Sequence, residues 1–375
     1  MPFEANTPVN AISPKLITTS RLATLQIRHF VTEREISSIV PLYILEAIFA
    51  GILDNANVRI LITGARGQDG SLLFEKATSY GFDALGVIKQ NGDSKSSDLS
   101  SNSKIIPWDL SNIDEAIKLL DFFNPDLILH MAAIHASSEF MSSLDKSVLR
   151  EMTSCHFQIT KNILEWQLNN TNTRSLIALS SQMFTAHQKI EEINEDSEVN
   201  PTTFYGETKA QAYNLVKKMR LDNDVQTGGV ILFNHSSIRS KSDFIFPVLA
   251  RKIADFLSGQ SQEISVRNPK ARVDMTAAEE VCEGILRLAQ SNFITDIVFS
   301  SGNSYLIEEV ITRCIRSFDI SAHPQIVATN GSLSPSNIVI GNPNKALKML
   351  NWKAEQMPWD ILSRMVTYEL QQRLL

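Results

Sequence analysis

The chain has few cysteines and no long uninterrupted apolar run, and these two shortages exclude several kinds of protein. Cysteine occurs at only three positions, Cys155, Cys282 and Cys314. An odd number of widely spaced cysteines predicts neither a disulfide framework nor a metal site, and it is typical of a protein in the reducing cytoplasm. The most apolar stretch, residues 39–53, contains a proline and a glutamate and is too short to span a bilayer.

The chain also has no excess of positive charge. Its charged residues make up 20% of the chain, which fits an ordinary soluble globular protein. The formal net charge of −6 argues against broad nucleic-acid binding, because such proteins carry an excess of basic residues. With 375 residues, of which 43% are hydrophobic, the chain is long enough for one large core domain with additions.

A glycine-punctuated stretch near residue 60 is the strongest signal that the chain does contain. The apolar run 58–62 is typical of a buried parallel strand, and Gly64, Gly67 and Gly70 follow it at a spacing of three. In such a turn the first glycine permits a tight bend, the second admits a pyrophosphate, and the third lets helix and strand pack closely. Because helical spacing and a second apolar run follow, the stretch predicts a dinucleotide-binding site.

Residues after the next three strands complete this predicted cofactor site. An acid after the second strand would bind a ribose 2′-hydroxyl and favour NAD, but Lys89 stands there. Lys89 can meet a 2′-phosphate, which favours NADP, although a solvated loop lysine is an equally good interpretation and NAD stays possible. Asp109, followed by Leu110, is placed to contact adenine, and the small Ala132 and Ala133 leave room for phosphate and ribose.

Strands and helices alternate along most of the chain. Six alternations between residues 58 and 234 predict an α/β fold with a doubly wound parallel sheet of the Rossmann type. Beyond them the alternation loosens, so we expect a smaller C-terminal substrate lobe, partly interleaved with the sheet domain. Helical spacing before the first strand predicts a helical N-terminal appendage. The predicted domains are therefore 1–57, 58–235 and 236–375.

Three residues predict the chemistry. Tyr205 and Lys209 are four residues apart and share one face of a predicted helix. A nearby ammonium lowers the pKa of a phenol, so Tyr205 is predicted to exchange a proton with a substrate hydroxyl during hydride transfer. Ser180, at the expected carboxyl end of the fifth strand, would bind the same oxygen. A Tyr-x-x-x-Lys pair alone is common on surface helices, but after a glycine turn it predicts a dehydrogenase site.

Together these motifs resemble the extended short-chain dehydrogenase/reductase family, and within it the GDP-mannose 4,6-dehydratases. The resemblance runs from about Arg59 to the C-terminus. Its most specific segments are residues 63–71, 231–235, 341–346 and 350–353. The predicted cofactor-binding residues are Gly64, Gly67, Gln68, Asp69, Gly70, Lys89, Asp109, Leu110, Ala132, Ala133, Tyr205 and Lys209.

The resemblance implies an NADP-dependent reaction on a nucleotide sugar, with a GDP-linked sugar as the expected substrate: oxidation at C4, loss of the C5 proton and of water from C6, and return of the hydride at C6. It implies Ser180, Tyr205 and Lys209 as catalytic residues and Asn234 as a neighbour of the substrate phosphates. Arg239 and Arg272 are its candidate phosphate or nucleotide contacts. Two long helices, 148–168 and 205–219, resemble those through which the family dimerises, which implies a homodimer or homotetramer.

One departure from the family concerns the reaction itself. The family places a glutamate two residues after the strand-five hydroxyl, and this chain has Gln182. An amide cannot cycle a proton near neutral pH. Glu191 or Glu192 can substitute, but both lie outside the motif. We therefore keep Gln182 with the catalytic residues as the position that decides whether dehydration takes place.

Other departures concern the substrate pocket. The family's arginine-lysine pair after strand six is replaced here by residues 247–248. Its ribose-binding motif is replaced by residues 334–337. Three functions stay open: a dehydratase-like enzyme, a 4-keto-sugar reductase or epimerase without dehydration, and a degenerate non-catalytic binding subunit. The intact serine, tyrosine and lysine argue against the last.

Overall fold

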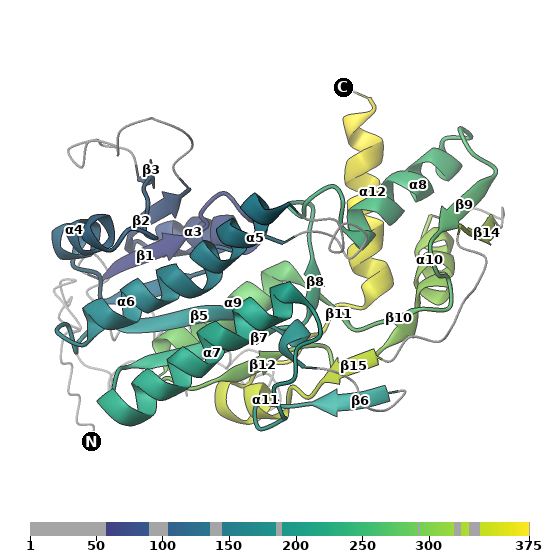
Figure 1. Ribbon diagram of the computed structural model, residues 1–375. Coiled ribbons are helices and arrows are strands. Elements are labelled where there is room, and N and C mark those ends of the chain that lie inside the picture. Colours follow the sequence, from purple (N-terminus) through teal and green to yellow (C-terminus); the bar gives the residue numbers. More distant parts are fainter. Residues whose placement is uncertain are drawn as a thin grey trace, which may run out of the picture. The chain divides into compact units, whose positions relative to one another are not determined.

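Seven parallel strands form the central sheet of the computed structural model (Figure 1). Their order is β12-β7-β5-β4-β1-β2-β3, and every neighbouring pair is parallel. The strands are β1 (Arg59–Thr63), β2 (Asp83–Ile88), β3 (Ile105–Pro107), β4 (Leu127–His130), β5 (Arg174–Ser180), β7 (Thr227–Leu232) and β12 (Ile297–Phe299). The strand order runs outward in both directions from the pair β1 and β4, so the predicted doubly wound parallel sheet is confirmed.

The structure describes residues 58–89, 104–135, 145–184, 190–291, 293–318, 324–329 and 338–374. From Arg59 onward the chain forms one compact unit. The predicted helical appendage, residues 1–57, lies outside the described residues, as do residues 334–337. No helix in the described part of the chain is long and apolar enough to cross a membrane.

Helices cover both faces of the sheet. On one face α4 (Ile113–Phe123) packs against α6 (Ile159–Gln167), and α6 packs against α7 (Phe204–Asn223). The predicted helix 148–168 is present as α5 (Lys146–Thr153), a π-helical turn η3 (Ser154–Gln158) and α6. On the other face α3 (Gln68–Ser79) packs against α9 (Ala278–Gln290), which also contacts α11 (Asn344–Leu350).

Helical spacing predicts a helix over residues 113–123, and local signals set the ends of α4 at these same residues. The Asn112 side chain accepts hydrogen bonds from the backbone N–H groups of Asp114 and Glu115, which caps the helix start. Asn124 ends the helix in the left-handed conformation at φ 44°. Both signals lie within a few residues of the helix ends, which is why the sequence alone could locate it.

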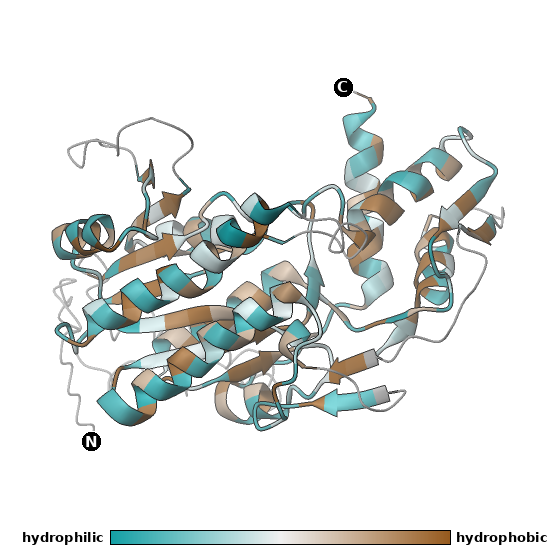
Figure 2. Ribbon diagram, in the orientation of Figure 1, coloured by the Kyte–Doolittle hydropathy of each residue, from teal (hydrophilic) through white to brown (hydrophobic). Residues whose placement is uncertain are grey.

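Apolar strands bind the layers together. Figure 2 shows the strands of the central sheet as mainly hydrophobic and the helices as mixed. Beneath α4 and α6, Leu61 and Ile128 from the sheet pack with Trp108, Leu119 and Ile163 in one buried cluster. Burying a side chain of this size stabilises a fold by about 1.5–3 kcal/mol. Strands buried on both faces are therefore a main source of stability for the central sheet and the helices that cover it.

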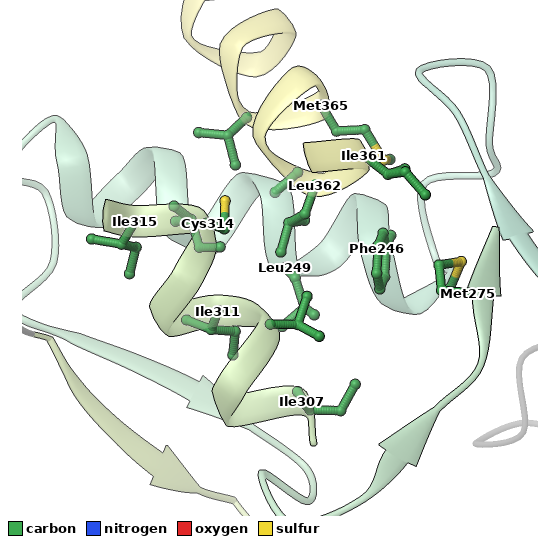
Figure 3. Packing of buried hydrophobic residues seen from close by; sticks show 14 of the residues in the cluster. Phe246, Leu249, Met275, Ile307, Ile311, Cys314, Ile315, Ile361, Leu362 and Met365 are labelled. Atoms are coloured by element: carbon green, nitrogen blue, oxygen red, sulfur yellow. The ribbon is translucent and has the colours of Figure 1, made fainter. Parts of the chain in front are cut away.

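The C-terminal lobe has a separate core. It contains α8 (Ile245–Leu257), α10 (Ile307–Arg316) and α12 (Pro358–Gln372), and the short strand pairs β9 (Glu263–Val266) with β14 (Gln325–Ala328) and β10 (Arg272–Val273) with β13 (Tyr305–Leu306). Figure 3 shows Phe246 and Leu249 of α8 packed with Ile311 of α10 and with Ile361 and Leu362 of α12. Three amphipathic helices thus bury one another's apolar faces.

The structure differs from the sequence prediction mainly in its short strands. The apolar run at residues 229–234 predicts one strand, but β7 ends at Leu232. Asn234 begins a separate strand, β8 (Asn234–Ser236), which pairs with β11 (Met275–Ala277). A further unpredicted pair is β6 (Ile190–Ile193) with β15 (Ile338–Gly341). Each of these strands has only three or four residues and pairs with a segment distant in sequence, so no local hydrophobic period marks the pair. Strand β12, from the C-terminal part of the chain, completes the central sheet.

Candidate active site

A cleft of about 1340 Å³ opens at the carboxyl ends of the sheet strands, where α8 and β9 of the C-terminal lobe form its other side. Every predicted cofactor-binding and catalytic residue lines it, as do Asn234 and Arg239. Arg272 is not among the described lining residues. It is exposed, and its guanidinium donates hydrogen bonds to the hydroxyl (2.9 Å) and carbonyl (2.6 Å) oxygens of Ser304. The structure therefore brings together all the predicted site residues except Arg272.

The glycine turn has the geometry that its spacing predicts. Gly64 has a φ of +68°, and a Cβ atom on Gly70 would lie 2.2 Å from the Gly64 carbonyl oxygen, so both positions exclude other residues. Helix α3 starts at Gln68, and its N-cap, Gly67, makes no side-chain capping bond. The first N–H groups of α3 are thus available to an anion, which suits the pyrophosphate of a dinucleotide.

A partly buried ion pair lies beside this helix start. The Nε2 atom of His235 is 3.0 Å from both carboxylate oxygens of Asp69, and its Nδ1 donates to the carbonyl of Phe233 at 2.7 Å. Burial alone would lower the pKa of His235, but the charge of Asp69 and these hydrogen bonds outweigh it and raise the pKa to about 9. The imidazolium neutralises Asp69, which would otherwise repel a phosphate at the helix start.

The turn after β4 is held by a neutral histidine. The Nε2 atom of His130 lies 3.2 Å from the carbonyl oxygen of Cys155, which can only accept, so this nitrogen carries the proton. Nδ1 then accepts from the Thr63 hydroxyl at 2.7 Å, and the Thr63 oxygen accepts from the Ala132 N–H at 3.1 Å. Burial lowers the pKa of His130 to about 3. This chain of bonds joins the ends of β1 and β4, where the cofactor contacts were predicted.

The predicted catalytic residues meet at the end of β5. The Ser180 hydroxyl accepts from the Gln182 N–H at 3.2 Å, and both Ser180 and Tyr205 line the cleft. The Lys209 ammonium is buried and donates to the Ala178 carbonyl at 2.7 Å. Burial raises the pKa of Tyr205, and the Ser180 hydroxyl opposes this rise. The structure does not show the predicted lowering of the Tyr205 pKa by Lys209, because burial dominates. Burial also lowers the pKa of Lys209 to about 8.

Another buried histidine, His156, positions Tyr205. The Nε2 atom of His156 accepts from the Ile134 N–H at 3.0 Å, so Nδ1 carries the proton and donates to the Thr208 hydroxyl at 2.8 Å. Thr208 in turn donates to the Tyr205 carbonyl at 2.9 Å. The His156 and Tyr205 rings meet edge to face with centroids 5.2 Å apart. His156 lies in the π-helical turn η3, an irregularity common at functional sites.

Gln182 contacts a histidine that the sequence analysis missed. Its amide nitrogen donates to His135 Nε2 at 3.2 Å, and its amide oxygen accepts from the Thr203 hydroxyl at 3.3 Å. His135 lies three residues after Ala132 in the loop that follows β4, and this place after a parallel strand was the signal that could have found it.

The two glutamates considered as substitutes for the missing carboxylate lie elsewhere. Glu191 and Glu192 belong to β6, and neither is among the described residues that line the cleft. Glu192 instead accepts a hydrogen bond from the Asn342 side chain. Neither glutamate is placed to exchange a proton with a molecule in the cleft.

Cations line the opposite side of the cleft. Lys241, Lys252 and Arg267 come from the C-terminal lobe and its connection to β8, and none of them was predicted. Lys252 donates to the Ser265 carbonyl at 2.5 Å. Arg239 contacts the Glu75 carboxylate and the Ser71 hydroxyl. In the described residues we find no cluster of three or more side chains suited to a metal ion.

Solved structures share this fold. RMD from Pseudomonas aeruginosa, solved in complex with NADPH, is 18% identical with a TM-score of 0.65, and the match covers 84% of this chain and 100% of that one. UDP-glucose 4-epimerase of Thermotoga maritima, solved with UDP-glucose, is 13% identical with a TM-score of 0.68, covering 85% and 100%. At these identities the likeness concerns the fold.

The sheet order, the glycine turn and the cleft are those of an extended short-chain dehydrogenase/reductase. The family model "GDP-mannose 4,6 dehydratase" matches residues 61–365. "GDP-mannose 4,6 dehydratase 2" of Caenorhabditis elegans is 24% identical over 348 residues, which are 83% of this chain and 88% of that protein. The chain belongs to the GDP-mannose 4,6-dehydratase family and is an enzyme of the nucleotide-sugar dehydratase and epimerase type.

Proposed function

We propose that this enzyme uses NADP to transfer a hydride at C4 of a GDP-linked sugar, with Tyr205 as the proton-transfer residue. The observation that carries the proposal is that Ser180, Tyr205 and Lys209 line the same cleft as the glycine turn. Hydride donor and proton donor must act on the same carbon–oxygen bond. A shared cleft at the carboxyl ends of the strands supports this arrangement.

Each residue has a distinct part in the proposed mechanism. Bound NADP supplies the hydride acceptor and donor. Tyr205 exchanges the proton of the C4 oxygen, and the Ser180 hydroxyl hydrogen-bonds that oxygen as charge develops on it. Lys209, held by the Ala178 carbonyl, places a positive charge in the wall behind Tyr205.

Lys89 supports NADP as the cofactor. Its ammonium lies 2.9 Å from the Glu151 carboxylate, and both side chains are at least half exposed. An exposed ion pair of this kind contributes about 0–1 kcal/mol, so a 2′-phosphate can displace Glu151 and take up the stronger charge-assisted bond. Glu151 is therefore a competitor that reduces the preference for NADP without removing it.

The cleft wall opposite the sheet supports a substrate that carries a nucleoside diphosphate. Arg239, Lys252 and Arg267 line the part of the cleft opposite the sheet, and charge-assisted bonds from such side chains bind phosphates well. The guanine base is proposed from the family alone. Val248, at one position where the family carries a cation, adds an apolar side chain to the cleft wall.

A second candidate function is reduction or epimerisation of a 4-keto sugar without dehydration. Two observations favour it. Gln182 is an amide that is already committed to His135 and Thr203. In addition, burial raises the pKa of Tyr205, and a neutral phenol donates a proton, as reduction of a ketone requires.

Incubation with a panel of nucleotide sugars and NADP or NADPH tests the proposal. The masses and retention of the products distinguish the reactions: loss of the mass of water means dehydration, a change by two hydrogens means redox chemistry, and an unchanged mass with altered retention means epimerisation. We expect one of these outcomes with a GDP-linked sugar. Absence of every one of them, with no change in cofactor absorbance, would contradict the proposal.

A further inference from the structure

We propose that His135 moves the proton at the sugar carbon next to the C4 keto group, in the place of the carboxylate that Gln182 has replaced. The inference rests on the proposed function, because it needs a 4-keto sugar in the cleft. It assigns a further catalytic residue to the site.

The position of His135 carries the first part of the argument. His135 lines the cleft, and its ring meets the Tyr205 ring edge to face with centroids 4.5 Å apart. Phe244 of the C-terminal lobe side lies against the same ring at 5.1 Å. Because Tyr205 is proposed to act at the C4 oxygen, the neighbouring ring is close to the carbons bonded to C4.

Gln182 and Thr203 hold the imidazole in a defined orientation. In the structure the Gln182 amide nitrogen donates to His135 Nε2 and its oxygen accepts from Thr203. Rotation of the amide by half a turn reverses both bonds, so that its oxygen accepts from His135 and its nitrogen donates to Thr203. Either arrangement satisfies the amide, so Gln182 can support both neutral and protonated His135. An amide has this orienting role beside histidine in some cysteine proteases.

The other ring nitrogen is left without a partner. His135 Nδ1 is buried and makes no hydrogen bond within the described residues. A buried polar atom of this kind costs about 1–3 kcal/mol, which a hydrogen bond to a bound molecule would offset. By contrast, His130 and His156 use both ring nitrogens in hydrogen bonds.

The carboxylates of the cleft are less suited to the role. Three of them have partners: Asp69 with His235, Asp109 with Ser111, and Glu151 with Lys89. Asp243 also lines the cleft but is exposed. It is therefore the rival to His135 that an experiment must test.

The surroundings keep His135 in the form that accepts a proton. Burial, and then the charges of Lys241 and Lys209, lower its pKa to about 4, while Asp243 acts in the opposite direction. Tyr205 is the other titratable group against the ring. His135 is thus neutral at neutral pH and can act as a base.

The step balances without any further reagent. With the Gln182 amide rotated so that Nε2 of His135 donates to its oxygen, Nδ1 is unprotonated and takes the proton from the carbon next to the ketone. The electron pair of that bond moves to give an enolate whose oxygen is hydrogen-bonded by Ser180 and Tyr205. The imidazolium then returns its proton. Delivery to carbon gives exchange or epimerisation, and delivery to the C6 hydroxyl releases water as the enolate pair forms the C5–C6 double bond.

Deuterium exchange tests the assignment apart from hydride transfer. A GDP-linked 4-keto sugar is incubated with enzyme and NADP in D₂O, and deuterium at the carbon next to the ketone is followed by NMR. The unmodified enzyme should catalyse exchange. His135→Gln should slow it about 10²–10⁴-fold, the usual effect of an acid–base group, and His135→Gln/Gln182→Glu should recover part of the rate. Asp243→Asn is the matched control and should exchange nearly normally.

A second arm measures reduction of the same keto sugar by NADPH. His135→Gln should keep this hydride transfer within a few-fold, which shows that the variant is folded and binds both molecules. If His135→Gln exchanges at the unmodified rate, or if Asp243→Asn is the variant that loses exchange, the assignment is overturned. If the unmodified enzyme binds no nucleotide sugar and transfers no hydride, it is the proposed function that fails.

The pH profile of the unmodified enzyme checks the result without any variant. Exchange should be constant from about pH 8 down to about pH 5 and fall as the pH drops through about 4, because His135 then becomes protonated. A rate that stays constant to lower pH would contradict the assignment.

Discussion

The two sides of the cleft differ in how they are built. On the sheet side every predicted residue, from Gly64 to Lys209, lines the cleft. On the C-terminal-lobe side the predicted Arg272 lies outside it, and Lys252 and Arg267 line it without having been predicted. The sheet side consists of strand–turn–helix units whose contacts are close in sequence. The lobe side depends on how α8, α10 and α12 pack, which is a long-range property.

The two sides also differ in burial. Tyr205 and Lys209 are buried and have fixed partners, whereas Arg239, Lys241 and Arg267 are exposed. Buried groups act through fixed geometry, and exposed cations act mainly through charge. Substitutions on the sheet side should therefore change turnover or stability, and those on the lobe side should change substrate affinity.

The largest expected effect is on the sheet side. Tyr205→Phe removes the proposed proton donor but keeps the ring that packs against His135 and His156. We expect turnover to fall about 10²–10⁴-fold with little change in cofactor affinity. Steady-state kinetics and a cofactor titration measure the two quantities. Retained turnover would remove the catalytic role from this residue.

The next effect concerns stability. The folded pKa of His235 is about 9 and its ordinary value is 6.5, so the ion pair with Asp69 stabilises the fold fully below pH 6.5 and loses this contribution as the pH rises through 9. At about 1.4 kcal/mol per pKa unit, the loss is about 3 kcal/mol. Urea unfolding at several pH values should show it in the unmodified protein and not in His235→Gln.

Lys209 acts in the opposite direction at higher pH. Its pKa is lowered from 10.5 to about 8, so its contribution to stability rises between these two pH values. This contribution is common to the unmodified protein and the His235→Gln variant, and it cancels in their difference. An identical pH dependence for both proteins would show that His235 does not hold its extra proton.

On the lobe side two nearby arginines form a matched pair. Arg267 lines the cleft, and Arg272 is turned to Ser304. Arg267→Gln should raise KM for the nucleotide sugar about tenfold, a loss of about 1–2 kcal/mol for a charge-assisted bond, with kcat nearly unchanged. Arg272→Gln should change KM less than threefold, because the Arg272 guanidinium is exposed and bonded to Ser304 rather than lining the cleft. Equal changes in KM for the two variants would mean that Arg267 does not bind the substrate from the cleft wall.

The smallest effects concern the choice of cofactor. Lys89→Ala should narrow the difference in affinity between NADP and NAD by about 1–2 kcal/mol, as for a lost charge-assisted bond. Glu151→Gln should widen it by less than about 1 kcal/mol, because it removes an exposed competitor. Binding titrations with both cofactors measure these differences. Equal affinity of the unmodified enzyme for NADP and NAD would rule out the preference.

The sequence located the long helices and the strands of the central sheet, and it missed the short strand pairs outside that sheet. Helix α4 has caps within its own sequence, and β1 with α3 follows a glycine pattern. By contrast, Ile190 of β6 pairs with Ile338 of β15, and Asn234 of β8 pairs with Met275 of β11. Pairs of short strands distant in sequence leave no period to detect.

The sequence by itself determined the parallel sheet, the glycine turn and the set of Ser180, Tyr205 and Lys209, because these follow from local spacing and from apolar runs. Only the tertiary structure decided which charges face the cleft and which groups are paired. It placed His135 beside Gln182, joined His235 to Asp69, and turned Arg272 away. The physical reason is that pKa values and hydrogen bonds depend on burial and on partners brought together from distant parts of the chain.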